Sequence, residues 1–150
     1  MQETVNQNII AALEELNFNG WTPIQEKVIP VLLRKSTDLI ALAQTGTGKT
    51  AAYGVPLIND ISNSRFALTP AVILSPTREL CIQIAETLKS FAKYLNDISI
   101  VAIYGGTNIS GQINQLKSKT DILVATPGRL LDLIRRHEVN ISKIRPSVSE

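Results

Sequence analysis

Apolar side chains recur every three or four positions in several stretches, and each stretch predicts an amphipathic helix. The predicted helices cover about residues 6–16, 22–33, 50–61, 77–95, 110–116 and 129–137. Two of them contain a proline. Pro30 predicts a break followed by a second short helical piece, and Pro56 predicts a kink or an end to the first turn of its helix. Residues 62–69 are largely polar and predict a loop.

Short apolar runs lie between these helices and predict β-strands, of which the run 71–74 suits a strand buried on both faces. They are residues 38–42, 71–74, 98–104 and 121–125. Because strands alternate with helices at intervals of roughly thirty residues, the pattern indicates an α/β fold with a parallel sheet and flanking helices. With 150 residues, 44% of them hydrophobic, the chain is long enough to form one domain with a sizeable core.

Composition and charge narrow the class of protein. Fifteen Lys and Arg residues against thirteen Asp and Glu residues give a formal charge of +2, which does not by itself indicate a polyanionic partner. Cys81 is the only cysteine, so an intramolecular disulfide is excluded and a reduced, cytoplasmic setting is favoured. The first residues do not form a leader peptide, and the apolar runs are shorter than a membrane span, so we predict a soluble chain without a membrane partner.

One stretch has the pattern of a phosphate-binding loop: Ala43-Gln44-Thr45-Gly46-Thr47-Gly48-Lys49-Thr50. Gly46 and Gly48 allow the backbone to turn so that successive N–H groups point at phosphate oxygens. Lys49 would reach the β- and γ-phosphates, and the Thr50 hydroxyl would bind Mg²⁺. The predicted helix that follows would direct its positive N-terminal end at the anion. A glycine-rich turn that merely joins a strand to a helix is the alternative interpretation.

Three more polar segments each follow a predicted strand: residues 75–79, 104–107 and 126–129. Because ligands gather at the carboxyl ends of parallel strands, we expect these segments to meet at one edge of the sheet with the phosphate loop. They combine small residues, hydroxyls and arginines, which suit contact with a phosphate backbone. Each segment alone has the composition of an ordinary turn, but the set of four indicates a second polyphosphate ligand, most simply a nucleic-acid strand.

This ordered set resembles the DEAD-box RNA helicases, in their first RecA-like domain, over about residues 5 to 145. Phe18 and the run Thr22-Pro23-Ile24-Gln25 are similar to the Q motif, and residues 43–50 are similar to motif I, in which the family ordinarily has Ala first. The resemblance extends to motif Ia (Pro76-Thr77-Arg78-Glu79-Leu80), the GG motif (Gly105-Gly106) and motif Ib (Thr126-Pro127-Gly128-Arg129).

The resemblance implies roles for these residues. The Q motif would select ATP, with Gln25 reading the adenine edge and Phe18 stacking on the base, and motif I would hold ATP and Mg²⁺. Motifs Ia, GG and Ib would contact the sugar-phosphate backbone of RNA with little sequence preference.

The sequence also departs from the family pattern. Trp21 stands where the Q motif usually has Pro, and residues 146–150, Pro-Ser-Val-Ser-Glu, stand where the family has a strand ending in Asp-Glu-Ala-Asp. No catalytic carboxylate is therefore predicted, and the second RecA-like domain is absent. We expect residues 1–150 to be a partial N-terminal RecA-like domain of the P-loop NTPase class, incomplete at its C-terminal end. Its sheet would have a gap between strand 38–42 and the other three strands.

The sequence therefore predicts the N-terminal domain of an ATP-dependent RNA helicase. One alternative is a truncated fragment that binds nucleotide or RNA without turnover, so hydrolysis by the isolated chain is left open. A second is an unrelated phosphate-loop enzyme such as a kinase or GTPase, which leaves Gln25 and the three downstream loops unexplained. A third is a remnant that folds only in part.

Overall fold

Ten regular elements are found in the computed structural model, which describes residues 5–34, 38–63, 70–140, 142, 144 and 147–149. The chain divides into two compact units. Unit 1 comprises residues 1–65 and 87–96, and unit 2 comprises residues 66–86 and 97–150. One boundary between the units, between residues 86 and 87, falls within a helix.

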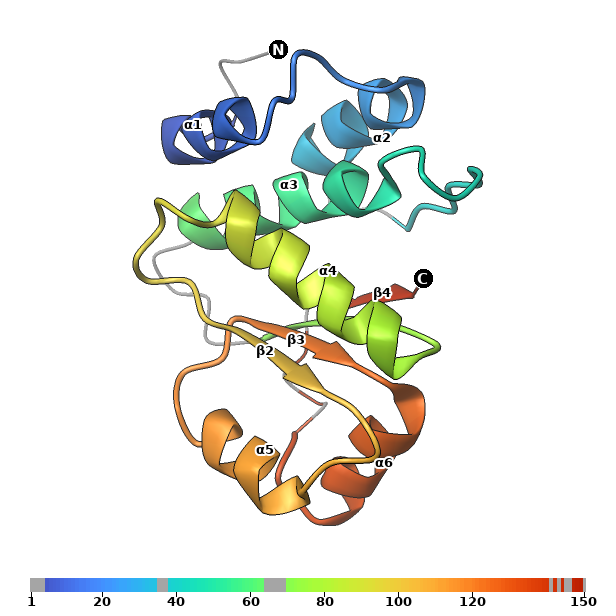
Figure 1. Ribbon diagram of the computed structural model, residues 1–150, viewed down its shortest axis with the longest axis vertical. Coiled ribbons are helices and arrows are strands. Elements are labelled where there is room, and N and C mark those ends of the chain that lie inside the picture. The colour runs from blue at the N-terminus through green and yellow to red at the C-terminus, as the bar shows by residue number, and fades with distance from the viewer. Residues whose placement is uncertain are drawn as a thin grey trace. The chain divides into compact units, whose positions relative to one another are not determined.

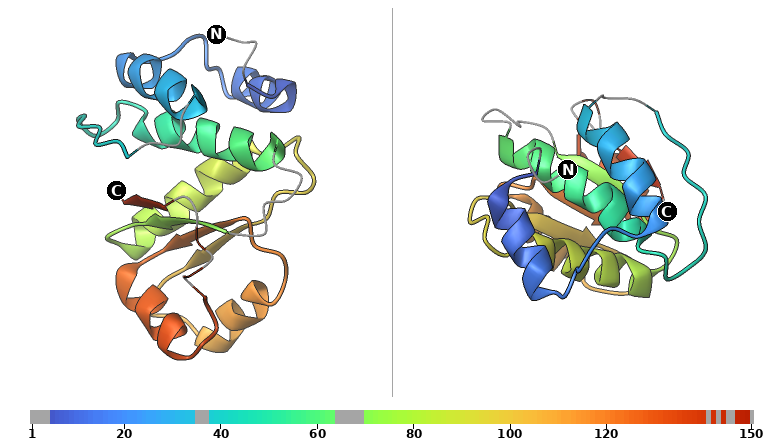
Figure 2. Two further views of the ribbon diagram at one scale, coloured as in Figure 1. Left: turned by 180° about the vertical axis from the view of Figure 1, so that it is seen from behind. Right: turned by 90° about the horizontal axis from the view of Figure 1, so that it is seen from above.

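Unit 1 is helical and contains α1 (Gln7–Glu15), α2 (Pro23–Arg34), α3 (Lys49–Asn63) and the last residues of α4 (Arg78–Phe91). Helix α2 lies alongside α3 (Figures 1 and 2). The Asn6 side chain caps α1 by accepting the Asn8 N–H at 2.9 Å, and the Asn6 N–H donates to Asn59 Oδ1 of α3 at 2.8 Å. These contacts fix the start of α1 against α3.

The predicted break at Pro30 and the predicted helix end at Pro56 are wrong, because α2 continues through Pro30 and α3 continues through Pro56. A proline inside a helix removes one hydrogen bond to the carbonyl four residues earlier. That loss is tolerated here because the flanking turns are packed: Val28, Ile29, Val55 and Leu57 are all buried. Packing therefore outweighs the local propensity to break. Most of the predicted loop 62–69 lies outside the described residues.

Unit 2 is built on a four-stranded parallel sheet of β1 (Ala71–Leu74), β2 (Ile100–Ile103), β3 (Ile122–Ala125) and β4 (Ser147–Ser149) in the order β2-β3-β1-β4. Helices α5 (Ile109–Leu116) and α6 (Pro127–Arg135) cover one face, and the first part of α4 covers the other (Figure 1). The parallel α/β sheet with flanking helices is thus confirmed.

The register of the strands explains how both faces are buried. Ala71 pairs with Ile122, and Ile100 pairs with Ile122 on the other side, so side chains alternate in step across three strands. Val72, Val101, Ile103 and Leu123 belong to the core under α5 and α6. On the opposite face, the buried Sγ of Cys81 on α4 lies 3.4 Å from the Val124 carbonyl oxygen.

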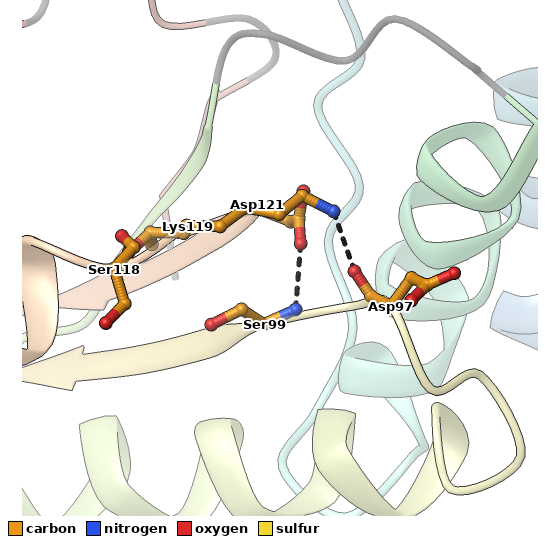
Figure 3. Close-up of polar contacts among 6 residues, drawn as sticks. Asp97, Ser99, Ser118, Lys119 and Asp121 are labelled. Carbon is orange, nitrogen blue, oxygen red and sulfur yellow. Dashed lines mark hydrogen bonds and ion pairs between the residues drawn. The ribbon is translucent and has the colours of Figure 1, made fainter.

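A buried carboxylate fastens the amino-terminal ends of β2 and β3 (Figure 3). Asp121 is only 3% exposed, and its side chain accepts the Ser99 N–H at 2.8 Å. Lys119 pairs with the same carboxylate at 3.1 Å and donates to the Asp97 carbonyl oxygen at 2.7 Å. Because a buried charge is costly unless it is paired and hydrogen-bonded, this arrangement stabilises the edge of the sheet opposite the polar loops.

Two expectations about strands are wrong. Residues 38–42 are not a strand; Ile40 and Leu42 are each 90% exposed, and no described strand lies beside them to satisfy their backbone groups. Conversely, residues 147–149 form β4, which pairs with β1 from Val72 to Leu74. The sheet therefore continues past β1, where a gap was expected. Among the described residues, no helix is long and apolar enough to cross a membrane.

Candidate functional site

The phosphate-loop segment precedes α3 in unit 1, as the sequence predicted, although it follows irregular chain rather than a strand. Gly46 and Gly48 have φ angles of 77° and 86°, a region that L side chains rarely adopt. The Thr47 Oγ1 donates to the Gln44 carbonyl oxygen at 2.8 Å, and Lys49 Nζ donates to the Ala43 carbonyl oxygen at 3.0 Å. The lysine ammonium group thus spans the loop.

This geometry suits an anion. Helix α3 begins at Lys49, so the N–H groups of its first turn have no partner within the helix and point out of its N-terminus. The helix dipole adds partial positive charge at the same end. Lys49 contributes a full charge, and Thr50 places a hydroxyl in the first turn. Backbone donors, an ammonium group and a hydroxyl are the donor set that a Mg²⁺-bound polyphosphate requires.

Gln25 joins α2 to the phosphate loop. It is only 1% exposed; its Oε1 accepts the Thr22 N–H at 3.0 Å, and its Nε2 donates to the Gly48 carbonyl oxygen at 3.1 Å. The Thr22 Oγ1 donates to the Thr47 carbonyl oxygen at 2.8 Å. Both the oxygen and the nitrogen of the Gln25 amide therefore form hydrogen bonds within the protein. This is a structural role in addition to the predicted adenine contact.

The absence of a side chain at Gly48 makes this contact possible. A Cβ at that position would lie 2.3 Å from Gln25 Nε2 and 3.4 Å from Thr22 Oγ1. Nothing lies within 4 Å of the equivalent point at Gly46. Of these two glycines, one is thus required for its backbone angle alone and the other also for the close approach of Gln25.

Phe18 packs within unit 1. Its ring meets the Phe91 ring edge to face, with centroids 5.8 Å apart and an interplanar angle of 89°. The Phe18 N–H donates to the Leu13 carbonyl oxygen, just after Asn17 has ended α1 with a φ of 62°. The predicted stacking of Phe18 on a base stays a prediction, and in this structure one side of the ring faces Phe91.

The other three predicted segments lie in unit 2 and follow adjacent strands. Residues 75–79 follow β1, 104–107 follow β2 and 126–129 follow β3, so they share the carboxyl edge of the sheet, as predicted. Pro76, Thr77, Arg78 and Glu79 are exposed at the start of α4. The Thr77 Oγ1 accepts the Leu80 N–H at 3.2 Å, which caps that helix.

Direct contacts bring these loops together. The Arg78 guanidinium lies over the Tyr104 ring, 5.1 Å from its centroid, and its Nη1 is 3.6 Å from the point where a Gly106 Cβ would be. Gly106 has a φ of 80°. Arg129 Nη2 donates to the Thr107 carbonyl oxygen at 3.0 Å. The loop after β2 is therefore contacted by two arginines, Arg78 at Tyr104 and Arg129 at Thr107.

Sequence reasoning missed Gln112 of α5. This side chain is 7% exposed; its Nε2 donates to the Tyr104 carbonyl oxygen at 3.1 Å and to Thr107 Oγ1 at 2.9 Å, and its Oε1 accepts from Arg129 Nη1 at 2.8 Å. A signal was present, since Gln112 is a polar residue in the stripe formed by Ile109, Ile113 and Leu116. A polar residue in an apolar stripe indicates a buried hydrogen-bonding role.

Cys81 is fully buried between α4 and the sheet. Burial raises the pKa of its thiol from 9.0 to about 11. The thiol is therefore protonated at neutral pH, and packing is its role.

Comparison with known proteins decides the family. The sequence matches the model of the DEAD/DEAH box helicases over residues 22–148. The chain belongs to this family. Helicase relatives include the ATP-dependent RNA helicase CshA of Listeria monocytogenes, 42% identical over 96% of this chain and 27% of that protein, and DeaD of Klebsiella pneumoniae, 40% identical over 91% of this chain and 21% of that protein.

A solved helicase structure agrees with the fold. The DEAD box protein from the hyperthermophile Methanococcus jannaschii superposes with a TM-score of 0.87 at 39% sequence identity, over 97% of this chain and 39% of that chain. The chain spans about a quarter of the length of these two helicases. The fold of a helicase RecA-like domain is thereby shown.

Proposed function

We propose that this chain is the N-terminal RecA-like domain of an ATP-dependent RNA helicase, with an ATP site in unit 1 and an RNA-backbone site in unit 2. The observation that carries the proposal is the hydrogen bond from Gln25 to the Gly48 carbonyl oxygen. It ties the residue expected to read adenine to the loop expected to hold the phosphates. A kinase or GTPase offers no reason for that tie.

In the ATP site, the residues of this chain would act on the triphosphate. The backbone N–H groups around Gly46 and Gly48 would bind phosphate oxygens, and Lys49 would leave the Ala43 carbonyl to pair with the β- and γ-phosphates. Thr50 would hold Mg²⁺, whose charge would offset that of the phosphates when it is bound. The Gln25 amide has two donors and two acceptor lone pairs, and the contacts to Thr22 and Gly48 each use one.

In the RNA site, the three loops at the carboxyl edge of the sheet would bind sugar and phosphate. Arg78 and Arg129 supply positive charge, and the start of α4 supplies N–H groups. Gly105, Gly106 and Gly128 allow close approach of an RNA strand. The other residues proposed to contact RNA are Pro76, Thr77, Glu79, Thr126 and Pro127. Since these contacts address the backbone, binding would show little sequence preference.

Binding without turnover is the second candidate. Phosphate release that is stimulated by RNA and abolished by Lys49→Ala would refute it. In either case we propose a cytoplasmic location, which the single, buried, unpaired cysteine supports.

Two titrations test the proposal, one for each unit. We expect Lys49→Ala to abolish ATP–Mg²⁺ binding, because it removes the only side-chain cation of the loop, while RNA affinity stays unchanged. We expect Arg78→Ala to weaken binding of single-stranded oligouridylate while ATP affinity, measured without RNA, stays unchanged. If wild-type chain binds neither ligand, or if Lys49→Ala binds ATP like wild type, the proposal is wrong.

A further inference from the structure

Gln112 is a buried amide at the meeting point of two loops that come from different strands. Its side chain contacts the loop after β2 through the Tyr104 carbonyl oxygen and Thr107 Oγ1, and the loop after β3 through Arg129. Arg129 closes the ring by donating to the Thr107 carbonyl oxygen. Three side chains and one backbone segment are therefore connected by four hydrogen bonds, all within unit 2.

Burying the polar side chain of Gln112 costs desolvation free energy, which indicates that the amide has a specific role at this position. Gln112 interrupts an apolar stripe, and an aliphatic residue at that position would join Ile113 and Leu116 in packing against the core of unit 2. A buried amide stabilises a fold only if its donors and acceptors are matched. Gln112 meets that condition, with Nε2 and Oε1 both paired. What the amide adds over an aliphatic side chain is a fixed position for both loops.

The chemistry of an amide also matters for charge. A carboxylate at position 112 would form a salt bridge with Arg129 and cancel much of its charge. The amide oxygen instead accepts one N–H at 2.8 Å and leaves the guanidinium positive. A guanidinium has five N–H donors, and the Gln112 and Thr107 contacts engage two of its nitrogens. Arg129 is thus oriented without being neutralised.

We propose that Gln112 is a positioning residue of the RNA site: it fixes the loop 104–107 against Arg129 and keeps the charge of Arg129 available to a phosphate. This inference rests on the proposed RNA-backbone function. Gln112 touches no RNA in this account and acts through Arg129 and Thr107. It is one step removed from the ligand, which explains why no motif in the sequence included it.

The test compares three variants of the chain in binding to fluorescein-labelled single-stranded oligouridylate at several salt concentrations. Gln112→Met keeps the volume and removes all three contacts, Gln112→Glu keeps an acceptor for Arg129 but adds a charge, and Gln115→Met is the matched control on the exposed face of α5. We expect affinity to fall about 3- to 10-fold in both position-112 variants, comparable to the loss of one ordinary hydrogen bond. We expect Gln115→Met to bind like wild type.

The salt dependence separates positioning from simple stability. In Gln112→Glu the neutralised Arg129 releases fewer counterions, so the slope of log K against log salt should become shallower by about 0.7. A merely structural role would lower the melting temperature but leave the slope and affinity of the folded chain unchanged. ATP affinity, measured without RNA, should be unchanged in all three variants, since the phosphate loop lies in unit 1.

Each outcome has a defined meaning. If wild type binds RNA and both position-112 variants bind with the same affinity and slope, this inference is overturned while the proposed function stands. If wild type does not bind RNA, the proposed function fails, and the positioning role fails with it. If Gln112→Met does not melt cooperatively, Gln112→Glu, which retains the Arg129 contact, decides alone by its salt slope.

Discussion

The pair Gly46 and Gly48 offers a direct test of how the phosphate loop is held. Both have positive φ angles, 77° and 86°, so alanine is strained at either position. They differ in their surroundings: a Cβ at Gly48 would lie 2.3 Å from Gln25 Nε2, whereas a Cβ at Gly46 would meet nothing within 4 Å. Gly46→Ala therefore measures the backbone term alone, and Gly48→Ala measures the backbone term together with displacement of Gln25.

The two terms can be estimated separately. A left-handed backbone costs a non-glycine residue about 1 to 2 kcal/mol, which is the expected loss for Gly46→Ala. Gln25 Nε2 is the end of a flexible side chain, but Gln25 is 1% exposed and bonded to Thr22 and Gly48. Moving it leaves buried polar groups unpaired, at about 1 to 3 kcal/mol. Gly48→Ala should therefore lower the free energy of unfolding by about 2 to 5 kcal/mol.

The free energy of unfolding of both variants can be measured by urea unfolding followed by the fluorescence of Trp21. This residue is the only tryptophan and precedes Thr22 in the sequence. The entropic gain of replacing glycine in the unfolded chain is common to both and cancels in the comparison. In a Gln25→Ala background, the excess loss of Gly48→Ala over Gly46→Ala should shrink to within about 0.5 kcal/mol. Equal losses for the two glycine variants in the wild-type background would refute the reasoning.

Further predictions concern the cores of the two units. Gly54→Ala places a Cβ 2.5 Å from Cδ2 of the fully buried Leu88. Overpacking of about 1 to 3 kcal/mol should outweigh a helix-propensity gain of about 1 kcal/mol, so we expect the urea midpoint to fall and Leu88→Ala to relieve the clash. A Gly54→Ala variant that is more stable than wild type would contradict this prediction. Asp121→Ala leaves the Ser99 N–H without its acceptor and should lower the free energy of unfolding in urea by about 1 to 3 kcal/mol. Lys119, whose side chain is 64% exposed, should contribute less than about 1 kcal/mol, as measured with Lys119→Ala. Equal losses for the two variants would contradict the role of the buried Asp121 carboxylate. Cys81, with its pKa raised to about 11, should resist dithiodipyridine at pH 8 until urea unfolds the chain, and immediate labelling of native protein would show that the thiol is accessible.

Helices and strands with strong periodicity were predictable from the sequence. The stripe from Ile84 through Leu88 to Phe91 predicted α4, and all three residues are buried. The apolar runs of β1 and β3 were predicted with boundaries within one residue. These elements form as the local pattern dictates, because their apolar faces meet a core on the expected side.

The errors arose where a neighbour decides the structure. Residues 38–42 have the composition of a buried strand, but a strand also needs a partner for its backbone hydrogen bonds, and the described residues place none beside it. Ser147 to Ser149 have weak strand composition and still pair with β1, whose open edge supplies those bonds. The pattern of apolar and polar residues within one segment does not show which edge of the sheet is free to pair with it.

The candidate site shows the same division. Motif spacing located Gln25 and the loop around Gly48, since both lie close to recognisable sequence signals. It did not reveal that both ends of the Gln25 amide hold protein atoms, nor that Gln112 joins two loops that are separated by a strand. Those contacts depend on the placement of whole elements, which local spacing does not encode.

The most direct test of the central claim is a titration of the chain with ATP–Mg²⁺ and GTP–Mg²⁺, repeated with Gln25→Ala. We predict that wild type prefers ATP and that Gln25→Ala loses roughly 2- to 13-fold of its ATP affinity, equivalent to a hydrogen bond of about 0.5 to 1.5 kcal/mol, with little change for GTP. Equal affinity of the wild-type chain for ATP and GTP would contradict the assignment of Gln25 to an adenine-reading site beside the phosphate loop.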